Sequence, residues 1–153
     1  HVQKWYPYEE AMAVPFFVSC PGRLPTKVRD SSHLVSHVDI LPTMCELAGI
    51  KPPPTTVGRS FAPLLEGKAV EWRDHLVCEA QLIGRMVRTE RYKFVRYKDD
   101  PVVQLFDMKD DPWETKNLAE QARFADTIRD HERLLKEWNA RITPAPGTKD
   151  PFL

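Results

Sequence analysis

Residues 76–106, LVCEAQLIGRMVRTERYKFVRYKDDPVVQLF, contain four short segments that are rich in β-branched and aromatic residues. The segments cover residues 76–80, 85–89, 91–97 and 103–106, and the gaps between them are short enough for hairpin turns. This pattern predicts an antiparallel meander of four strands. It distinguishes the second half of the chain from the first.

A long helix is predicted after these strands, over residues 121–142. Its apolar positions recur at helical spacing and the positions between them are charged, so one face of the helix is expected to pack on the sheet. These apolar positions are Phe124, Ile128, Leu135, Trp138 and Ile142. Residues 143–153, with three prolines and one glycine, predict a loose tail.

The first half of the chain has an α/β pattern. Residues 14–19, VPFFVS, form an apolar run that a Pro-Gly step closes, as expected of a strand buried on both faces of a parallel sheet. Residues 33–36 predict a second short strand. The fold class that follows is α/β: the end of a large mixed sheet, then a small four-stranded antiparallel sheet with a packed C-terminal helix.

Two helices are predicted between these parts. Asp39 is placed to be the N-cap of a helix that Gly49 ends. Ser60 is placed to cap a shorter helix that ends near Gly67.

The chain is expected to divide near residue 68. Residues 1–68 would finish the large α/β domain, and residues 69–153 would form the antiparallel-sheet subdomain. The chain begins with His-Val-Gln-Lys and without a leader sequence, which predicts a fragment of a longer protein.

The composition disfavours several classes of function. The 153 residues carry 22 Lys+Arg and 22 Asp+Glu, so the formal net charge is zero and a dedicated binder of polyanions is not expected. No apolar run approaches the roughly 18 residues that a membrane-spanning helix needs, so no membrane partner is predicted. The six glycines form no phosphate-binding loop, and the three cysteines form no disulfide framework.

Basic and aromatic residues alternate between Arg85 and Lys98, which raises the alternative of a nucleic-acid-binding sheet. Successive strand residues point to opposite faces, so Arg91 and Lys93 are expected on one face, and Arg96 and Lys98 on the other. No nucleic-acid partner is therefore predicted. The histidines and cysteines lack the spacing of a metal site, so no metal ligand is assigned in this chain.

Lys4 is the residue that we single out for chemistry. It stands among aromatic residues just before the predicted buried strand, where a sheet edge would let its ammonium group meet an anionic oxygen. From the residues alone, a solvated lysine near the start of the chain is the favoured alternative.

Six short motifs stand in order along the chain. They are Lys4-Trp5-Tyr6-Pro7-Tyr8-Glu9-Glu10-Ala11, Pro21-Gly22-Arg23, Ser36-His37-Val38-Asp39, Gly58-Arg59-Ser60, Arg91-Tyr92-Lys93 and Leu105-Phe106-Asp107. Each is weak alone, but in this order they resemble the C-terminal part of the sulfatases of the alkaline-phosphatase-like superfamily. The resemblance covers essentially residues 4–142.

The resemblance implies hydrolysis of a sulfate ester by a formylglycine nucleophile beside a divalent metal, usually calcium. Lys4 matches the family's lysine that binds the sulfate and helps the departing oxygen, and so becomes the catalytic candidate. The formylglycine and the calcium ligands lie upstream in the family, and nothing in this chain matches them. His1 stands three residues before Lys4, whereas the family's histidine usually stands five before its lysine, so His1 is not assigned the role of that histidine.

Ser19 begins a Ser-Cys-Pro-Gly-Arg run that satisfies the bare pattern for formylglycine formation. The family's signature continues into a Thr-Gly step, and a different sequence follows here, so Ser19 is not taken as the nucleophile. Glu79, Gln81 and Arg85 lie where the family's C-terminal part approaches the substrate pocket. They are weaker candidates for substrate contact.

The expected function is that of the C-terminal part of a sulfatase, which acts on a sulfated saccharide or another sulfated small molecule together with the missing N-terminal catalytic part. The isolated chain is expected to be inactive. The alternatives are a phosphonate monoester hydrolase or phosphodiesterase of the same superfamily, and a non-catalytic folding or interaction module that self-associates. The cysteines fit a periplasmic, extracellular or cytoplasmic protein alike.

Overall fold

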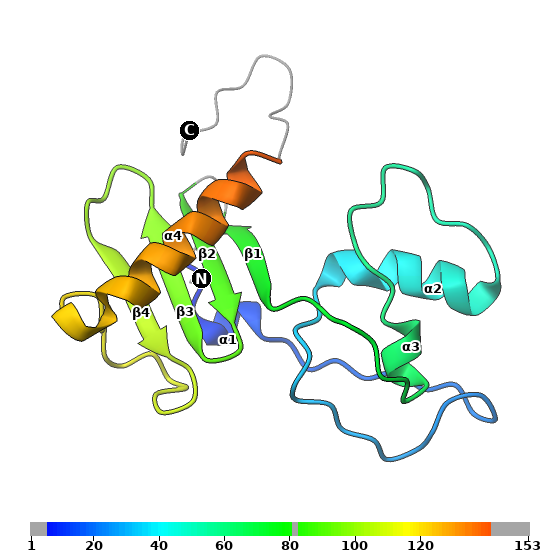
Figure 1. Cartoon of the computed structure of the whole chain (residues 1–153). Coiled ribbons are helices and arrows are strands. Elements are labelled where there is room, and N and C mark those ends of the chain that lie inside the picture. Colours follow the sequence, from blue (N-terminus) through cyan, green and yellow to red (C-terminus); the bar gives the residue numbers. More distant parts are fainter. Residues whose placement is uncertain (1–5, 81–82, 142–153) are drawn as a thin grey trace, which may run out of the picture. The chain divides into compact units, whose positions relative to one another are not determined.

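Figure 1 shows the computed structural model of the chain, which describes residues 6–80 and 83–141. The chain forms two compact units. One unit consists of the N-terminal segment up to Pro15 together with the chain from His75 onward, and the other consists of Phe16–Asp74. The predicted boundary near residue 68 concerns the architecture of a longer protein, and it stays a prediction.

The predicted antiparallel meander is confirmed. Four strands pair in chain order, each antiparallel to the next. They are β1 (His75–Ala80), β2 (Gly84–Thr89), β3 (Tyr92–Tyr97) and β4 (Val103–Asp107), and each begins and ends within one residue of its predicted segment. The agreement is close because alternation and turn residues are local signals.

The predicted C-terminal helix is present but shorter than expected. A 3₁₀ turn, η2 (Ala122–Phe124), leads into α4 (Ala125–Asn139). The helix packs on one face of the sheet, as its apolar spacing predicted, with Phe124 and Ile128 against the core. The last position of the predicted stripe, Ile142, lies outside the described residues.

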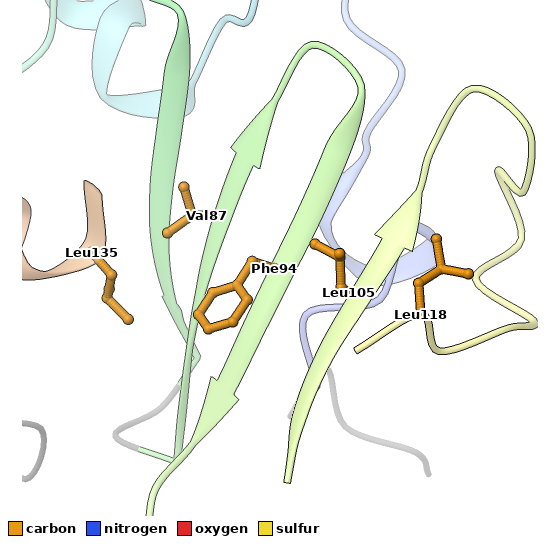
Figure 2. Close-up of a cluster of buried hydrophobic side chains, with 5 residues drawn as sticks. All are labelled: Val87, Phe94, Leu105, Leu118 and Leu135. Atoms are coloured by element: carbon orange, nitrogen blue, oxygen red, sulfur yellow. The ribbon is translucent and has the colours of Figure 1, made fainter. Parts of the chain in front are cut away.

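The core of this unit lies between α4 and the sheet (Figure 2). Val87, Phe94 and Leu105 lie side by side across β2, β3 and β4 and are fully buried. Leu135 of α4 and Leu118, from the connection before it, complete the cluster. Since burial of one such side chain contributes about 1.5–3 kcal/mol, this cluster is the main hydrophobic stabilisation of the unit.

The opposite face of the sheet carries the N-terminal segment with its short helix α1 (Glu9–Met12). The ring of Tyr8 lies 6.4 Å from that of Phe106, and the ring of Tyr6 lies 5.6 Å from that of Tyr97. Phe106 and Tyr97 alternate along their strands with residues of the core face, so they point away from α4. The start of the chain therefore belongs with the sheet that is formed by its second half.

In the Phe16–Asp74 unit, the two predicted helices are present. A 3₁₀ turn, η1 (His37–Asp39), continues into α2 (Ile40–Ala48). Gly49 ends α2 in the left-handed conformation with φ of +71°, as predicted from its lack of a side chain. The shorter helix is α3 (Ala62–Leu65).

The start of α3 lies one residue later than expected. Phe61 rather than Ser60 occupies the N-cap position. The Ser60 hydroxyl nevertheless accepts a hydrogen bond from the N–H of Ala62 over 3.2 Å. Ser60, one residue before the N-cap, thus provides a hydrogen-bond acceptor for a backbone N–H in the first turn of α3.

The prediction of strands over residues 14–19 and 33–36 is wrong for the chain as described. Neither segment is paired into a sheet, and the side chain of Phe17 is 88% exposed. A strand needs a neighbouring strand for its backbone N–H and C=O groups. Among residues 6–80 and 83–141, no other segment pairs with these two.

Candidate functional site

The catalytic candidate Lys4 lies outside the described residues, as do His1 and Gln81. The catalytic assignment of Lys4 therefore stays a prediction. The structure describes the chain from Tyr6 onward, two residues after Lys4, and it shows what holds this part of the chain in place.

Glu9, Lys93 and Glu114 form a buried ion cluster on the sheet face that α1 covers. The Nζ of Lys93 lies 2.8 Å from Oε1 of Glu114 and 3.2 Å from Oε2 of Glu9. The backbone N–H of Glu9 donates to Oε2 of Glu114 over 2.5 Å. The side chain of Lys93 is fully buried, whereas those of Glu114 and Glu9 are 1% and 34% exposed. One carboxylate thus joins a lysine of the sheet to the first turn of α1.

Local structure explains how these groups meet. Lys93 follows Tyr92 and precedes Phe94 on β3, so it points to the face opposite the core. Glu9 is the first residue of α1, where the backbone N–H has no acceptor within the helix. Glu114 has a φ of +55°, a conformation that non-glycine residues rarely adopt, and its N–H donates to the carbonyl of Asp111 over 3.1 Å.

The electrostatics of the cluster give Lys93 a structural role. Its ammonium group is paired with two carboxylates and is shielded from water. Arg88 interacts with the same carboxylates. Burial is the largest effect on Arg88 and lowers the pKa of its guanidinium, while Glu9 and Glu114 act to raise it. Two cations and two carboxylates therefore balance one another on this face.

Three tyrosines lie close to the same segment. The rings of Tyr6 and Tyr8 are 6.4 Å apart and are 53% and 38% exposed. Burial raises the pKa of the Tyr97 phenol, and the neighbouring Tyr8 and Tyr6 raise it further, so its hydroxyl stays protonated at neutral pH. The segment that follows Lys4 in the sequence presents the partly exposed aromatic rings of Tyr6 and Tyr8.

Arg85, one of the weaker candidates for substrate contact, is only 2% exposed. Its Nε donates to Oε2 of Glu79 over 2.9 Å, and its Nη1 donates to Oδ1 of Asn139 over 2.7 Å. The guanidinium also lies 5.2 Å from the ring centroid of Trp138. These contacts tie the end of α4 to β2, which gives Arg85 a structural role, and its contact with a substrate stays a prediction.

The basic residues of β3 divide between the two faces of the sheet, as strand geometry predicted. Lys93 lies on the α1 face within the buried ion cluster. Arg96 lies on the α4 face, with its Nη1 3.3 Å from Oε1 of Glu132. Each of these cations is paired with carboxylate.

In the Phe16–Asp74 unit, Asp39 occupies the N-cap position of α2, but its carboxylate does not cap this helix. It accepts hydrogen bonds from the N–H groups of Ser36 and Arg59, both over 2.8 Å, and from both terminal nitrogens of Arg73, over 2.7 and 2.6 Å. The predicted position of Asp39 at the start of the helix is therefore confirmed, but its carboxylate does not bond the N–H groups of α2 and instead accepts from Ser36 as the third residue of a capping box in η1. A bidentate arginine is a stronger partner for a fully buried carboxylate than the N–H groups at a helix start.

Two further motifs have structural explanations. A Cβ atom on Gly58 would lie 1.8 Å from the carbonyl oxygen of Val38, so this position has no room for a side chain. In the Pro-Gly-Arg motif, Gly22 has a φ of +79°, and the guanidinium of Arg23 donates to the carbonyl of Leu47 near the end of α2. Both motifs therefore fix the path of the chain around α2.

The resemblance places the calcium ligands upstream of this chain. Within residues 6–80 and 83–141, no group of three or more His, Cys, Asp or Glu could hold a metal ion. Ser19 is exposed and lies in a segment without regular structure, not at the start of a helix. No helix in the described part of the chain is long and apolar enough to span a membrane.

Comparison with known proteins assigns this chain to a family. The model of the family described as N-sulphoglucosamine sulphohydrolase, C-terminal, matches residues 1–141. The Delta 4,5-hexuronate-2-O-sulfatase of Bacteroides thetaiotaomicron is 36% identical over 144 residues, which cover 88% of this chain and 30% of that protein. The arylsulfatase of Clostridium perfringens is 31% identical over 146 residues, covering 91% of this chain and 30% of that protein.

Solved structures give the same result for the fold. The structure of a 2-O GAG sulfatase is 38% identical, with a TM-score of 0.60 over 67% of this chain and 24% of that one. The phosphonate monoester hydrolase of Agrobacterium radiobacter is 26% identical, with a TM-score of 0.61 over 71% of this chain and 25% of that one. The fold is thus that of the C-terminal part of an alkaline-phosphatase-like protein.

The chain belongs to the sulfatase family and corresponds to its C-terminal part. It spans about 30% of the length of the curated relatives described above.

Proposed function

We propose that this chain is the C-terminal part of a sulfatase that hydrolyses a sulfate ester, and that Lys4 is its catalytic contribution. The observation that supports this most directly is the family match over residues 1–141, which includes Lys4 and the motif around it. We further propose that residues 1–68 complete the large α/β domain of the whole protein and that residues 69–153 form its subdomain.

In this proposal Lys4 acts by charge. Its ammonium group would stabilise the negative charge that grows on the sulfuryl oxygens or on the departing alkoxide. The formylglycine nucleophile and the calcium ion, which the resemblance implies, would be supplied by the remainder of the protein. When bound, calcium would supply Lewis acidity.

The substrate class is a sulfated saccharide or an aryl or alkyl sulfate. Similar proteins are named for sulfated uronate or glycosaminoglycan substrates, and one is named for aryl sulfates. These different substrates support a sulfate ester as the substrate class, but they do not identify which sulfate ester this protein hydrolyses. Neither a nucleic acid nor a membrane is among the proposed partners.

The test is substitution of Lys4 in the whole protein. Lys4→Ala is expected to lower kcat for sulfate release from an aryl sulfate by about 100- to 1,000-fold, because one charged group is lost from the transition state. Lys4→Arg should retain more activity than Lys4→Ala. The isolated 153-residue chain should release no sulfate. Full activity of Lys4→Ala would overturn the catalytic role of Lys4.

A phosphonate monoester hydrolase is the second candidate, because one such enzyme shares the fold at 26% identity. The two candidates are separated by comparing kcat/KM of the whole protein for an aryl sulfate and for a phosphonate monoester with the same leaving group. A preference for the sulfate ester supports the proposal, and a preference for the phosphonate favours the alternative. Inactivity on both would favour a non-catalytic module.

A further inference from the structure

The segment that leads away from Lys4 is held at several points by the second half of the chain. Pro7 is fully buried, and the rings of Tyr6 and Tyr8 contact Tyr97 and Phe106. The most directional of these contacts is the buried ion cluster, in which Glu114 accepts from the backbone of Glu9 and pairs with the side chain of Lys93. The segment is therefore fixed both along its length and in its rotation.

The chemistry of the buried ion cluster favours a role in positioning the N-terminal segment over a role in stabilising the fold. Replacing a buried ion pair by apolar side chains of similar volume is often neutral or stabilising, so such a pair adds little stability that packing could not supply. What it adds is register: the N–H and the carboxylate of Glu9 meet Glu114 and Lys93 at this place on the sheet. A shift of the segment by one residue would bring Tyr8 or Glu10 to this place and would also move Pro7 out of its fully buried site.

We propose that the buried ion cluster of Glu9, Lys93 and Glu114 positions Lys4 for sulfate-ester hydrolysis by fixing the register of residues 6–12 on the C-terminal sheet. This inference rests on the proposed function of Lys4. Glu9, Lys93 and Glu114 are positioning residues, because they act through Lys4 and do not touch the substrate. The C-terminal sheet thereby affects catalysis indirectly, through the position of Lys4.

The experiment uses the whole protein and the variants Glu114→Gln and Glu9→Gln. Both exchange a carboxylate for an amide of the same shape, and Glu9 is partly exposed, so Glu9→Gln should fold even if Glu114→Gln does not. The control is Asn139→Ala, which removes a buried acceptor from Arg85 on the opposite face of the same sheet. It should perturb the sheet without touching the N-terminal segment.

The expected result is a loss of kcat of about 10- to 100-fold for Glu114→Gln, since a displacement of about 1 Å can have this effect. KM should change less than kcat, and Asn139→Ala should retain kcat within about twofold. In a Lys4→Ala background, Glu114→Gln should have almost no further effect, because the residue through which it acts is gone. A residue that only stabilises the fold would lower the activity in both backgrounds.

Hydrogen exchange of the amides of residues 8–13 gives a readout that does not depend on activity. Exchange should accelerate in Glu114→Gln and Glu9→Gln but not in Asn139→Ala. Unchanged exchange together with unchanged kcat in both glutamine variants would overturn the positioning role. If the wild-type protein releases no sulfate, the proposed function itself fails and the catalytic part of this inference falls with it, while the exchange data would still decide whether the cluster anchors the segment.

Discussion

Asp39 and Glu114 are buried carboxylates that each join segments distant in the sequence. Asp39 accepts hydrogen bonds from Arg59 and Arg73, and Glu114 joins the first residue of α1 to Lys93. In both cases a cation and at least one backbone N–H group lie against the carboxylate, as burial of charge requires. These two residues therefore fix the geometry of their units more strongly than a solvated acid could.

The first prediction concerns Asp39. Asp39→Asn should lower the free energy of unfolding of the whole protein, measured in urea, by about 3–5 kcal/mol, because Arg73 loses its bidentate countercharge. The control is Asp126→Asn, whose side chain is 84% exposed and pairs with Arg129 within α4. The control should show no measurable change. Equal effects of the two substitutions would contradict the assignment of Asp39 as a buried structural charge.

At the scale of elements, α4 is docked on the sheet by Leu135 and by His131, which is 4% exposed. The Nδ1 of His131 lies 2.7 Å from the carbonyl oxygen of Thr127, so Nδ1 carries the proton and donates. Its Nε2 lies 3.2 Å from the hydroxyl of Thr89 on β2. Burial is the largest effect on this ring and lowers its pKa below the ordinary value of 6.5.

This shift predicts a dependence of stability on pH. Because the folded protein binds the proton of His131 less readily than the unfolded chain does, the free energy of unfolding should fall as the pH drops below about 6.5. The hydrogen bond to the Thr127 carbonyl and the charge of Asp130 oppose the shift, and His75 adds to it, but burial outweighs the opposing effects. His131→Phe keeps an aromatic ring between Tyr92 and Phe94 and cannot titrate.

The measurement is urea unfolding of the wild type and of His131→Phe between about pH 7.5 and about pH 5, a range that spans the ordinary histidine pKa. The wild type should lose more stability over this range than the variant, since all other titrating groups are common to both proteins. Parallel curves would show that α4 docking does not depend on the neutral form of His131.

At the scale of the whole molecule, the two units differ in how well they cover their apolar side chains. The sheet unit has a buried core on the α4 face and aromatic contacts on the other face. The Phe16–Asp74 unit leaves many apolar side chains exposed in the described structure. They include Phe16, Phe17, Val18, Val28, Val38, Leu41, Met44, Ile50 and Val57. An exposed apolar run without a pairing strand favours association with other chains.

The isolated chain should therefore self-associate. Phe17→Lys, which places a charge in the unpaired apolar run, should reduce the association measured by sedimentation velocity. Val57→Lys adds the same charge at a similarly exposed position outside the run, 86% exposed compared with 88% for Phe17, and should have a smaller effect. A monodisperse monomer at high concentration would count against association through this run.

The sequence by itself determined the elements whose signals are local. Strand alternation and turn residues predicted β1–β4 to within one residue, the spacing of Phe124, Ile128 and Leu135 predicted α4, and Gly49 predicted the end of α2. The order of six short motifs also indicated the sulfatase family, to which the chain belongs. These features depend on residues that are close together in the chain, so a pattern along the sequence records them.

Only the tertiary structure decided which distant groups meet. The partners of Asp39 and of Lys93, the covering of the sheet by α1, and the unpaired state of residues 14–19 all depend on the path of the chain through space. A carboxylate just before a helix predicts a capping side chain, but the carboxylate of Asp39 has a stronger partner in Arg73. An apolar run predicts a strand, but residues 14–19 have no neighbouring strand with which to pair. Burial and pairing are properties of neighbours in space, and the linear sequence does not specify those neighbours residue by residue.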